Sequence, residues 1–523
     1  MRKSTLLAFT ALSLTACDLS PDFVMPDVEK PAAFKEAAAA DPAAAPVAPA
    51  TDGKWKRFDD KAQIGEFAWW RMFNMPELDA LMEQAMKDNP SLDVAVERVN
   101  NARAMTDSEY AALYPTVGVG FGPERQLQSP ASLKPELPPG FNITTKPYTL
   151  YTANATIAWE PDLFGRNRAT ARAAAKDADA EQNNYFATRL ALQTDLAETY
   201  FRVASLRQES AILKQTIATR EQTLKYTKQK YDVGEIDSLD LSKEEADIAS
   251  VESDAASVQQ QLDVAEHALA ILIGKPPSEL AVKVTELKGA PPAIPAGMPS
   301  TLLERRPDVK QAADAIAAAN ERIGVARSGY FPDISLSAVG GFVSGDLGHL
   351  FQWSNRTWLI GPLAGTILTQ PIFEGGQLAA QRAEAQAGYQ GAVANYRVSV
   401  LQAFGEVEDN LSGIRNAADQ VKADDRGIAA AKRAYDVAKQ RYDVGYSSHL
   451  EFLDAERTLL AAQRTKVQVV GNQYITTVQL VKALGGSWLT PVATDHASPS
   501  PKTVGVQADE PSLVERWWDD VTP

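Results

Sequence analysis

The chain has 523 residues, enough for several domains, and apolar residues make up 45% of it, which excludes a fully disordered or collagen-like protein. The net charge of −15 argues against nucleic-acid binding, because that binding depends on neutralising phosphates. A single cysteine excludes an intramolecular disulfide, and four histidines leave few ligands for a transition metal.

The N-terminus has the pattern of a secretory signal. Two basic residues precede an apolar stretch over residues 6–14, which is too short to cross a bilayer, where about 20 residues are needed. The stretch ends in Leu14-Thr15-Ala16-Cys17, which resembles the bacterial lipobox. Residues 1–16 are therefore predicted to be a lipoprotein signal peptide, and Cys17 to carry N-palmitoyl and S-diacylglycerol groups. The alternative is an ordinary signal peptide followed by an idle thiol.

The segment after the signal is predicted to be an acylated tether over residues 17–54. Five prolines among the alanines of residues 26–54 favour an extended chain. No later segment offers a run of about 18 apolar residues, so no transmembrane helix is predicted in the mature protein. Any part that spans a membrane would consist of strands.

The remainder of the chain contains an internal repeat. Residues 231–234 recur as residues 442–445 with the same sequence, Tyr-Asp-Val-Gly, 211 positions later. Further landmarks recur in the same order, among them Asn89-Pro90 as Arg306-Pro307, which indicates a duplicated unit of about 210 residues. The predicted domains are a first repeat over residues 55–274, an equatorial linker over 275–300, a second repeat over 301–486 and an equatorial or disordered tail over 487–523.

Each repeat is predicted to contain a shorter helix, two strands and two long helices. Helical spacing of apolar residues indicates the shorter helices, and long stretches with few or no Pro and Gly indicate the long ones. Alternation of apolar residues indicates the strands, although over residues 357–369 it is only loose. The first repeat places these elements at residues 90–112, 116–121, 151–159, 166–230 and 237–272. The second places them at 307–329, 334–342, 357–369, 376–443 and 448–483. A soluble coiled-coil rod would explain the helices, but not the paired amphipathic strands.

The predicted fold class is an α+β membrane protein. Four strands in one chain leave exposed edges, which lipid does not tolerate. Three chains would close a 12-stranded barrel, within the range of known outer-membrane barrels. The helices would then extend away from the barrel as a coiled-coil tube.

Several motifs in the chain match one family. Trp69-Trp70 with Phe73 and Leu78, the segment 159–166 (WEPDLFGR) and the segment 303–309 (LERRPDV), followed by Asn320, Gly324 and Phe331-Pro332, resemble TolC-like outer-membrane efflux channels of the lipoprotein type. The resemblance covers roughly residues 55–490.

This resemblance implies a homotrimer with a 12-stranded β-barrel in the outer membrane of a Gram-negative bacterium and a periplasmic α-helical barrel. The family passes compounds outward, without catalysis, for an inner-membrane resistance-nodulation-division (RND) transporter joined by a periplasmic adaptor protein. The anchor would lie in outer-membrane lipid. Asp18 argues against an outer-membrane anchor, because an aspartate after the acylated cysteine tends to retain lipoproteins in the inner membrane of enteric bacteria.

The resemblance also assigns candidate site residues. Val233, Gly234, Val444 and Gly445 would form hairpin tips that contact the adaptor. Leu450 and Asp454, four residues apart on one helix face, would line a periplasmic gate. A carboxylate ring there would favour cations. Asp454 is otherwise a solvated carboxylate or an ion-pair partner of Arg457 or Lys243.

The sequence contains no catalytic constellation and no metal-binding motif, so neither an active site nor a cofactor is predicted. Two other functions fit some of the same features. The first is an outer-membrane duct for type I protein secretion. The second is a periplasmic structural coiled-coil lipoprotein, which would be soluble without detergent.

Overall fold

The computed structural model describes residues 18–28, 34–36, 68–127, 146–279, 283–294, 305–360 and 368–486. These residues form two compact units. The sheet unit takes its residues from Met1–Glu29, Val99–Asn183 and Asp308–Leu401. The hairpin unit takes its residues from Lys30–Arg98, Asn184–Pro307 and Gln402–Pro523.

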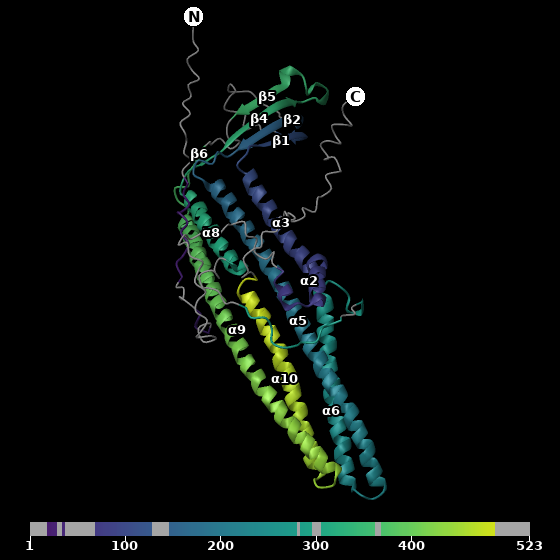
Figure 1. Cartoon of the computed structure of the whole chain (residues 1–523). Helices are drawn as coiled ribbons and strands as arrows, with labels where there is room; N and C mark the ends of the chain where they lie inside the picture. The colour runs from purple at the N-terminus through teal and green to yellow at the C-terminus, as the bar shows by residue number, and fades with distance from the viewer. Residues whose placement is uncertain are drawn as a thin grey trace, which may run out of the picture. The chain divides into compact units, whose positions relative to one another are not determined.

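The described elements of the first half are η1 (Trp69–Phe73), α2 (Pro76–Asp88), α3 (Pro90–Ala111), β1 (Thr116–Gln126), β2 (Tyr148–Trp159), α5 (Arg166–Asp232), α6 (Ser238–Leu272) and η3 (Pro277–Glu279) (Figure 1). Those of the second half are α8 (Pro307–Ser328), β3 (Asp333–Ile334), β4 (Leu336–Ser344), η4 (Leu347–His349), η5 (Trp353–Asn355), β5 (Arg356–Ile360), β6 (Leu368–Thr369), α9 (Gln377–Asp443) and α10 (His449–Ala483).

Three helices recur in the same order in both halves. The first of them, called here the opening helix (α3 or α8), has 22 residues, and the long helix after the strands, α5 or α9, has 67. The returning helix, α6 or α10, has 35 residues. These lengths confirm the internal repeat and the predicted helices. The domain boundaries assigned from the sequence stay predictions.

The sheet unit contains a four-stranded antiparallel sheet in the order β1-β2-β4-β5. The strand predicted over 334–342 begins differently, because Asp333–Ile334 forms β3 and pairs with β6 in a separate two-stranded sheet. The strand predicted over 357–369 is likewise divided between β5 and β6. Alternation of apolar residues depends on the local backbone alone, so it does not tell which sheet a segment joins.

One face of the four-stranded sheet is apolar and exposed. The register aligns Val117, Ile157, Ala338 and Ile360 across the four strands. The next line on this face runs from Val119 to Trp358, whose side chains are 89% and 72% exposed. Paired residues point to the same side of a sheet, so these side chains share one surface. A continuous exposed apolar surface of this kind marks contact with lipid or with another chain.

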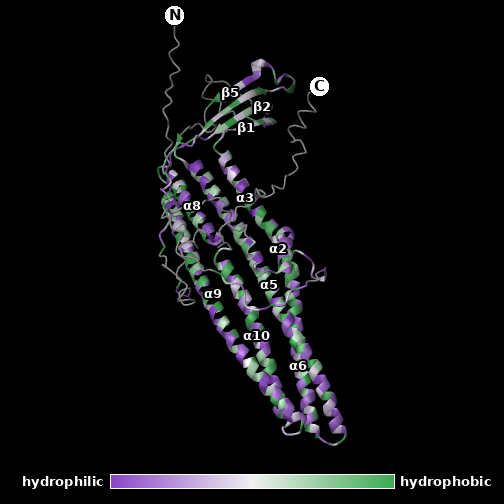
Figure 2. Ribbon diagram, viewed as in Figure 1, coloured by the Kyte–Doolittle hydropathy of each residue, from purple (hydrophilic) through white to green (hydrophobic). Residues whose placement is uncertain are grey.

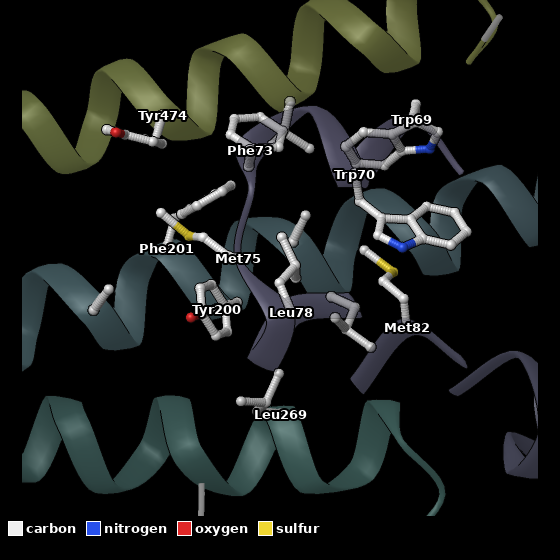
Figure 3. Close-up of a cluster of buried hydrophobic side chains, with 14 of the residues drawn as sticks. Trp69, Trp70, Phe73, Met75, Leu78, Met82, Tyr200, Phe201, Leu269 and Tyr474 are labelled. Carbon is white, nitrogen blue, oxygen red and sulfur yellow. The ribbon is translucent and has the colours of Figure 1, made fainter. Parts of the chain in front are cut away.

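The core of the hairpin unit joins an N-terminal segment to three long helices. Figure 3 shows side chains of η1 and α2 lying among residues of α5, α6 and α10. Phe73 contacts Phe201 and Tyr474, with ring centroids 4.9 and 6.0 Å apart. The Trp69 indole Nε1 donates a hydrogen bond to Gln193 Oε1 at 3.1 Å, which satisfies its buried polar atom. Trp69-Trp70 therefore serves packing within the unit.

The repeat landmarks meet one another in the structure. At the end of α6, the Asn89 side chain donates to the Leu272 carbonyl at 2.7 Å, and Gly274 packs on Asp88. At the end of α10, the Arg306 side chain donates to the Ala483 carbonyl at 3.1 Å. Each returning helix thus ends against the residue that precedes the proline of the opening helix. These side chains satisfy carbonyls that a helix end leaves without partners.

Hydrophilic and hydrophobic residues are interspersed along the long helices, as Figure 2 shows for α5, α6, α9 and α10. In the part of the chain that the structure describes, no helix is both long and apolar enough to cross a membrane.

Candidate functional site

Two tight turns end the long helices α5 and α9, and they have the same geometry. Gly234 and Gly445 adopt φ values of 80° and 78°, in the left-handed region that glycine enters without steric cost. The amide after each glycine donates to a carbonyl five residues earlier, Glu235 to Lys230 and Tyr446 to Arg441. This is the Schellman arrangement, and it ends a helix sharply. Val233 and Val444, the predicted tip residues beside the glycines, are exposed.

The returning helices begin with capping side chains. Asp237 Oδ1 accepts hydrogen bonds from the Leu239 and Asp240 amides at 2.8 and 3.2 Å, and Ser448 Oγ accepts one from the Glu451 amide at 3.3 Å. Such caps satisfy amides that the first helical turn leaves free. The Ser448 cap fixes the residue at which α10 starts, and with it the positions of Leu450 and Asp454 on that helix.

The predicted gate residues lie on the exposed side of α10. Leu450 is 54% exposed, and Asp454 is exposed as well, whereas Phe452 and Leu453 between them are buried. Neither ion pair considered for Asp454 is present, because Lys243 pairs with Asp240 and Arg457 with Asp247. Within the described residues Asp454 forms no ion pair. The structure thus places both side chains on one solvent-facing strip, as the spacing predicted.

A set of ion pairs with buried members joins α5, α6 and α10, and the sequence patterns did not reveal it. Arg464 on α10 contacts Glu209 at 2.9 Å and Asp254 at 2.5 Å. Arg220 on α5 pairs with Asp247 on α6 and lies 3.4 Å from Glu456 on α10. Burial raises the pKa of Glu456, although the Arg220 guanidinium opposes the rise.

Part of the predicted tether contacts the helices. In the sheet unit, Asp18 pairs with Arg172 at 2.9 Å, and Arg172 also pairs with Glu321 at 2.8 Å. The Asn320 amide donates to the Pro21 carbonyl at 2.7 Å. In the hairpin unit, the Lys35 and Glu36 amides donate to the Glu408 carboxylate, and Phe34 packs on Phe404. Cys17 lies outside the described residues.

Groups of three or more His, Cys, Asp or Glu side chains arranged to hold a metal ion do not occur in the described ranges. The candidate functional surfaces of this chain are therefore the exposed apolar sheet face, the two turns and the exposed strip of α10. None of them is a pocket with convergent catalytic groups.

This architecture, with helical hairpins and a sheet with one exposed apolar face, defines the class of TolC-like outer-membrane channels. The fold is similar to that of the outer-membrane channel OprN, with a TM-score of 0.76, 27% identity and coverage of 90% of this chain and 100% of that one. The family model for outer membrane efflux proteins matches residues 81–275 and 298–486, and the chain belongs to that family. It is a family of transport channels rather than of enzymes, and its members lie in the outer membrane.

Curated relatives extend the comparison. The toluene efflux pump outer membrane protein TtgC of Pseudomonas putida is 32% identical over 81% of this chain and 86% of its own length. The pyoverdine export outer membrane protein OpmQ of Pseudomonas aeruginosa is 30% identical over 80% of this chain and 87% of its own length. These findings confirm the resemblance, the fold class and the outer-membrane location expected from the sequence.

Proposed function

We propose that this protein is the outer-membrane exit duct of a tripartite efflux system. Small toxic compounds would reach it from an inner-membrane RND transporter through a periplasmic adaptor and leave the cell by passive movement. The observation that carries the proposal is the exposed apolar face of the four-stranded sheet in a member of the efflux family. The related proteins are named for compounds as different as toluene and pyoverdine, so the family resemblance leaves the compound open.

The working form would be a homotrimer. Strands β1 and β5 are the edges of the sheet, and neither has a second partner among the described strands. Unpaired backbone groups are costly in lipid, so the edges must be paired by other copies of the chain. Three copies of a four-stranded sheet supply 12 strands, which is enough for a closed barrel in outer-membrane lipid.

Two measurements test this function. The purified protein in a planar lipid bilayer should form pores, and a strain that lacks the gene should become sensitive to some members of a toxic-compound panel. Resistance unchanged across the panel, with loss of an exported protein instead, would favour the type I secretion duct. A monomer that stays soluble without detergent and forms no pore would favour the structural coiled-coil alternative.

The gate is proposed to be formed by Leu450 and Asp454 from three chains. Their exposure on one strip of α10 supports a lining role, because a leucine ring and a carboxylate ring would restrict hydrated solutes. The neighbouring turns, with Val233 and Gly234 in the first and Val444 and Gly445 in the second, are proposed to contact the adaptor. Their exposed valines offer apolar contacts that the single chain leaves unused.

Asp454→Ala is expected to raise the basal conductance of the pore about threefold or more and to weaken its preference for cations, because it removes the carboxylate ring. Single-channel recording measures both quantities. Asp436→Ala removes an exposed carboxylate that pairs with Lys432 on α9 and serves as the matched control. An Asp454→Ala pore that conducts like the wild type would remove Asp454 from the gate.

Cys17 is proposed to carry N-palmitoyl and S-diacylglycerol groups that anchor the chain in outer-membrane lipid, since buried acyl chains contribute about 0.8 kcal/mol per CH₂. Docking of Asp18 and Pro21 on the sheet unit supports an anchor held close to that unit. We expect Cys17→Ala to abolish labelling with radioactive palmitate. Label retained by Cys17→Ala would show that another group is acylated. Asp18→Ala serves as the control and should keep the label.

A further inference from the structure

A buried histidine–carboxylate pair lies directly beside the proposed gate. His449, the first residue of α10, has its Nε2 atom 2.7 Å from Oε2 of Glu244 on α6. The two side chains are 3% and 0% exposed. His449 immediately precedes Leu450, so this contact fixes the first turn of α10, and with it the gate strip, to a helix of the other repeat.

The pair depends on this single hydrogen bond. The other ring nitrogen, Nδ1, and the other carboxylate oxygen, Oε1 of Glu244, are buried and have no hydrogen-bond partner among the described residues. The ring also packs against Tyr442 and Phe452, with centroids 5.1 and 6.2 Å away. These contacts hold the imidazole in place without adding a second polar bond.

Charged and titratable side chains from four helices surround the pair. The titratable and charged groups near it are Arg220 and Lys230 on α5, Asp240, Glu244 and Asp247 on α6, Lys439 and Tyr442 on α9, and Glu456 and Arg457 on α10. Arg220 and Arg457 pair with Asp247 and Glu456, which leaves His449 as the hydrogen-bonded partner of Glu244. A buried carboxylate is costly unless a positive charge accompanies it.

We propose that His449 is a positioning residue that holds the gate strip of α10 against α6 through Glu244, and that its protonation tightens this hold. The proposal rests on the gate function proposed above for Leu450 and Asp454. An imidazolium donates a charge-assisted hydrogen bond to a carboxylate, and this bond is roughly twice as strong as a neutral one. A histidine side chain typically becomes positively charged as the pH falls from about 8 to about 5. We therefore expect the contact to be stronger at about pH 5.5 than at about pH 8.

The first test is the pH dependence of conductance. Wild-type pores should conduct about five times more at about pH 8 than at about pH 5.5, since the weaker contact releases the gate strip. His449→Gln keeps a hydrogen-bond donor but cannot titrate, so its conductance should be nearly equal at the two values. His267→Gln, on α6 and outside the pair, should keep the wild-type ratio. A ratio that survives in His449→Gln, or is absent from the wild type, overturns the proposal.

A second measurement does not depend on pore formation. Hydrogen exchange of amides 449–454 should be faster in His449→Gln than in the wild type at about pH 5.5, and the two should converge at about pH 8. The exchanged pair Glu244→His with His449→Glu should restore slow exchange at the acidic value. Equal exchange in wild type and His449→Gln at both values overturns the positioning role. If Asp454→Ala leaves conductance unchanged while this exchange difference persists, the gate assignment fails and the His449–Glu244 contact remains.

Discussion

Phe201→Ala is expected to destabilise the hairpin unit by about 3–5 kcal/mol, because the substitution leaves a cavity at the centre of its core. The Phe201 side chain is fully buried, and its ring lies 4.9 Å from Phe73 and 5.0 Å from Tyr474. It therefore contacts both the N-terminal segment and the last described helix. Chemical denaturation of the detergent-solubilised protein, followed by circular dichroism, measures the loss.

Phe201→Leu is the matched control at the same position. It keeps most of the buried volume, so its cost should stay below about 1.5 kcal/mol. Equal losses for the two variants would mean that the aromatic ring itself, rather than the filled volume, holds the core together. No loss for Phe201→Ala would contradict the placement of η1 against α5 and α10.

Gly274→Ala should cost about 2–4 kcal/mol, for two reasons that act together. Gly274 has a φ of 75°, which L side chains rarely adopt. A Cβ atom there would also overlap the Asp88 carbonyl oxygen, so the backbone before Pro90 would have to move. The end of α6 would then lose its contact with Asn89. The free energy of unfolding measures the effect.

Gly289→Ala is the control that separates the strain of a positive φ from the overlap with a neighbouring atom. Gly289 has a φ of 76°, but a Cβ atom there would meet nothing within 4 Å. Its cost should be only the backbone strain of about 1–2 kcal/mol. The repeat equivalent, Gly485→Ala, should fall between the two, because its Cβ atom would lie 2.9 Å from the Arg305 carbonyl oxygen, a milder overlap than at Gly274. If Gly274→Ala and Gly289→Ala lowered the free energy of unfolding equally, the backbone at Asp88 would be able to move away from the added Cβ atom at little cost.

The proposed duct is passive and has no energy source of its own. We therefore expect its transport to be controlled by opening and closing of the gate. A passive duct contributes selectivity through the residues that line its narrowest part. The residues proposed for that part of this chain, Leu450 and Asp454, lie at the start of α10, which is capped by Ser448 and joined to α6 by the His449–Glu244 contact. If the proposed gate is correct, conditions that weaken this contact should change how often the duct is open while the residues that line it stay the same.

Most of the architecture could be predicted from local sequence patterns. Long stretches with few Pro or Gly define α5 and α9, and alternating apolar residues define the strands, because both signals depend on local backbone geometry. The repeated Tyr-Asp-Val-Gly segments predicted both hairpin turns, since glycine favours the positive φ that each turn requires. The motif around Arg306-Pro307 indicated the family.

The burial of particular charged side chains, and the partners that they contact, became visible in the three-dimensional packing alone. Glu244 and His449 are 205 positions apart, and nothing in either local sequence marks them as partners. The same holds for Asp18 with Arg172, and for the division of residues 333–344 between two sheets. Hydrophobic periodicity records which face of an element is covered, but the identity of a polar partner depends on how elements distant in the sequence pack together. For this chain, the spacing of Leu450 and Asp454 predicted that they share an exposed strip, and the packing of α10 on α6 brought together the buried pair His449 and Glu244 beside it.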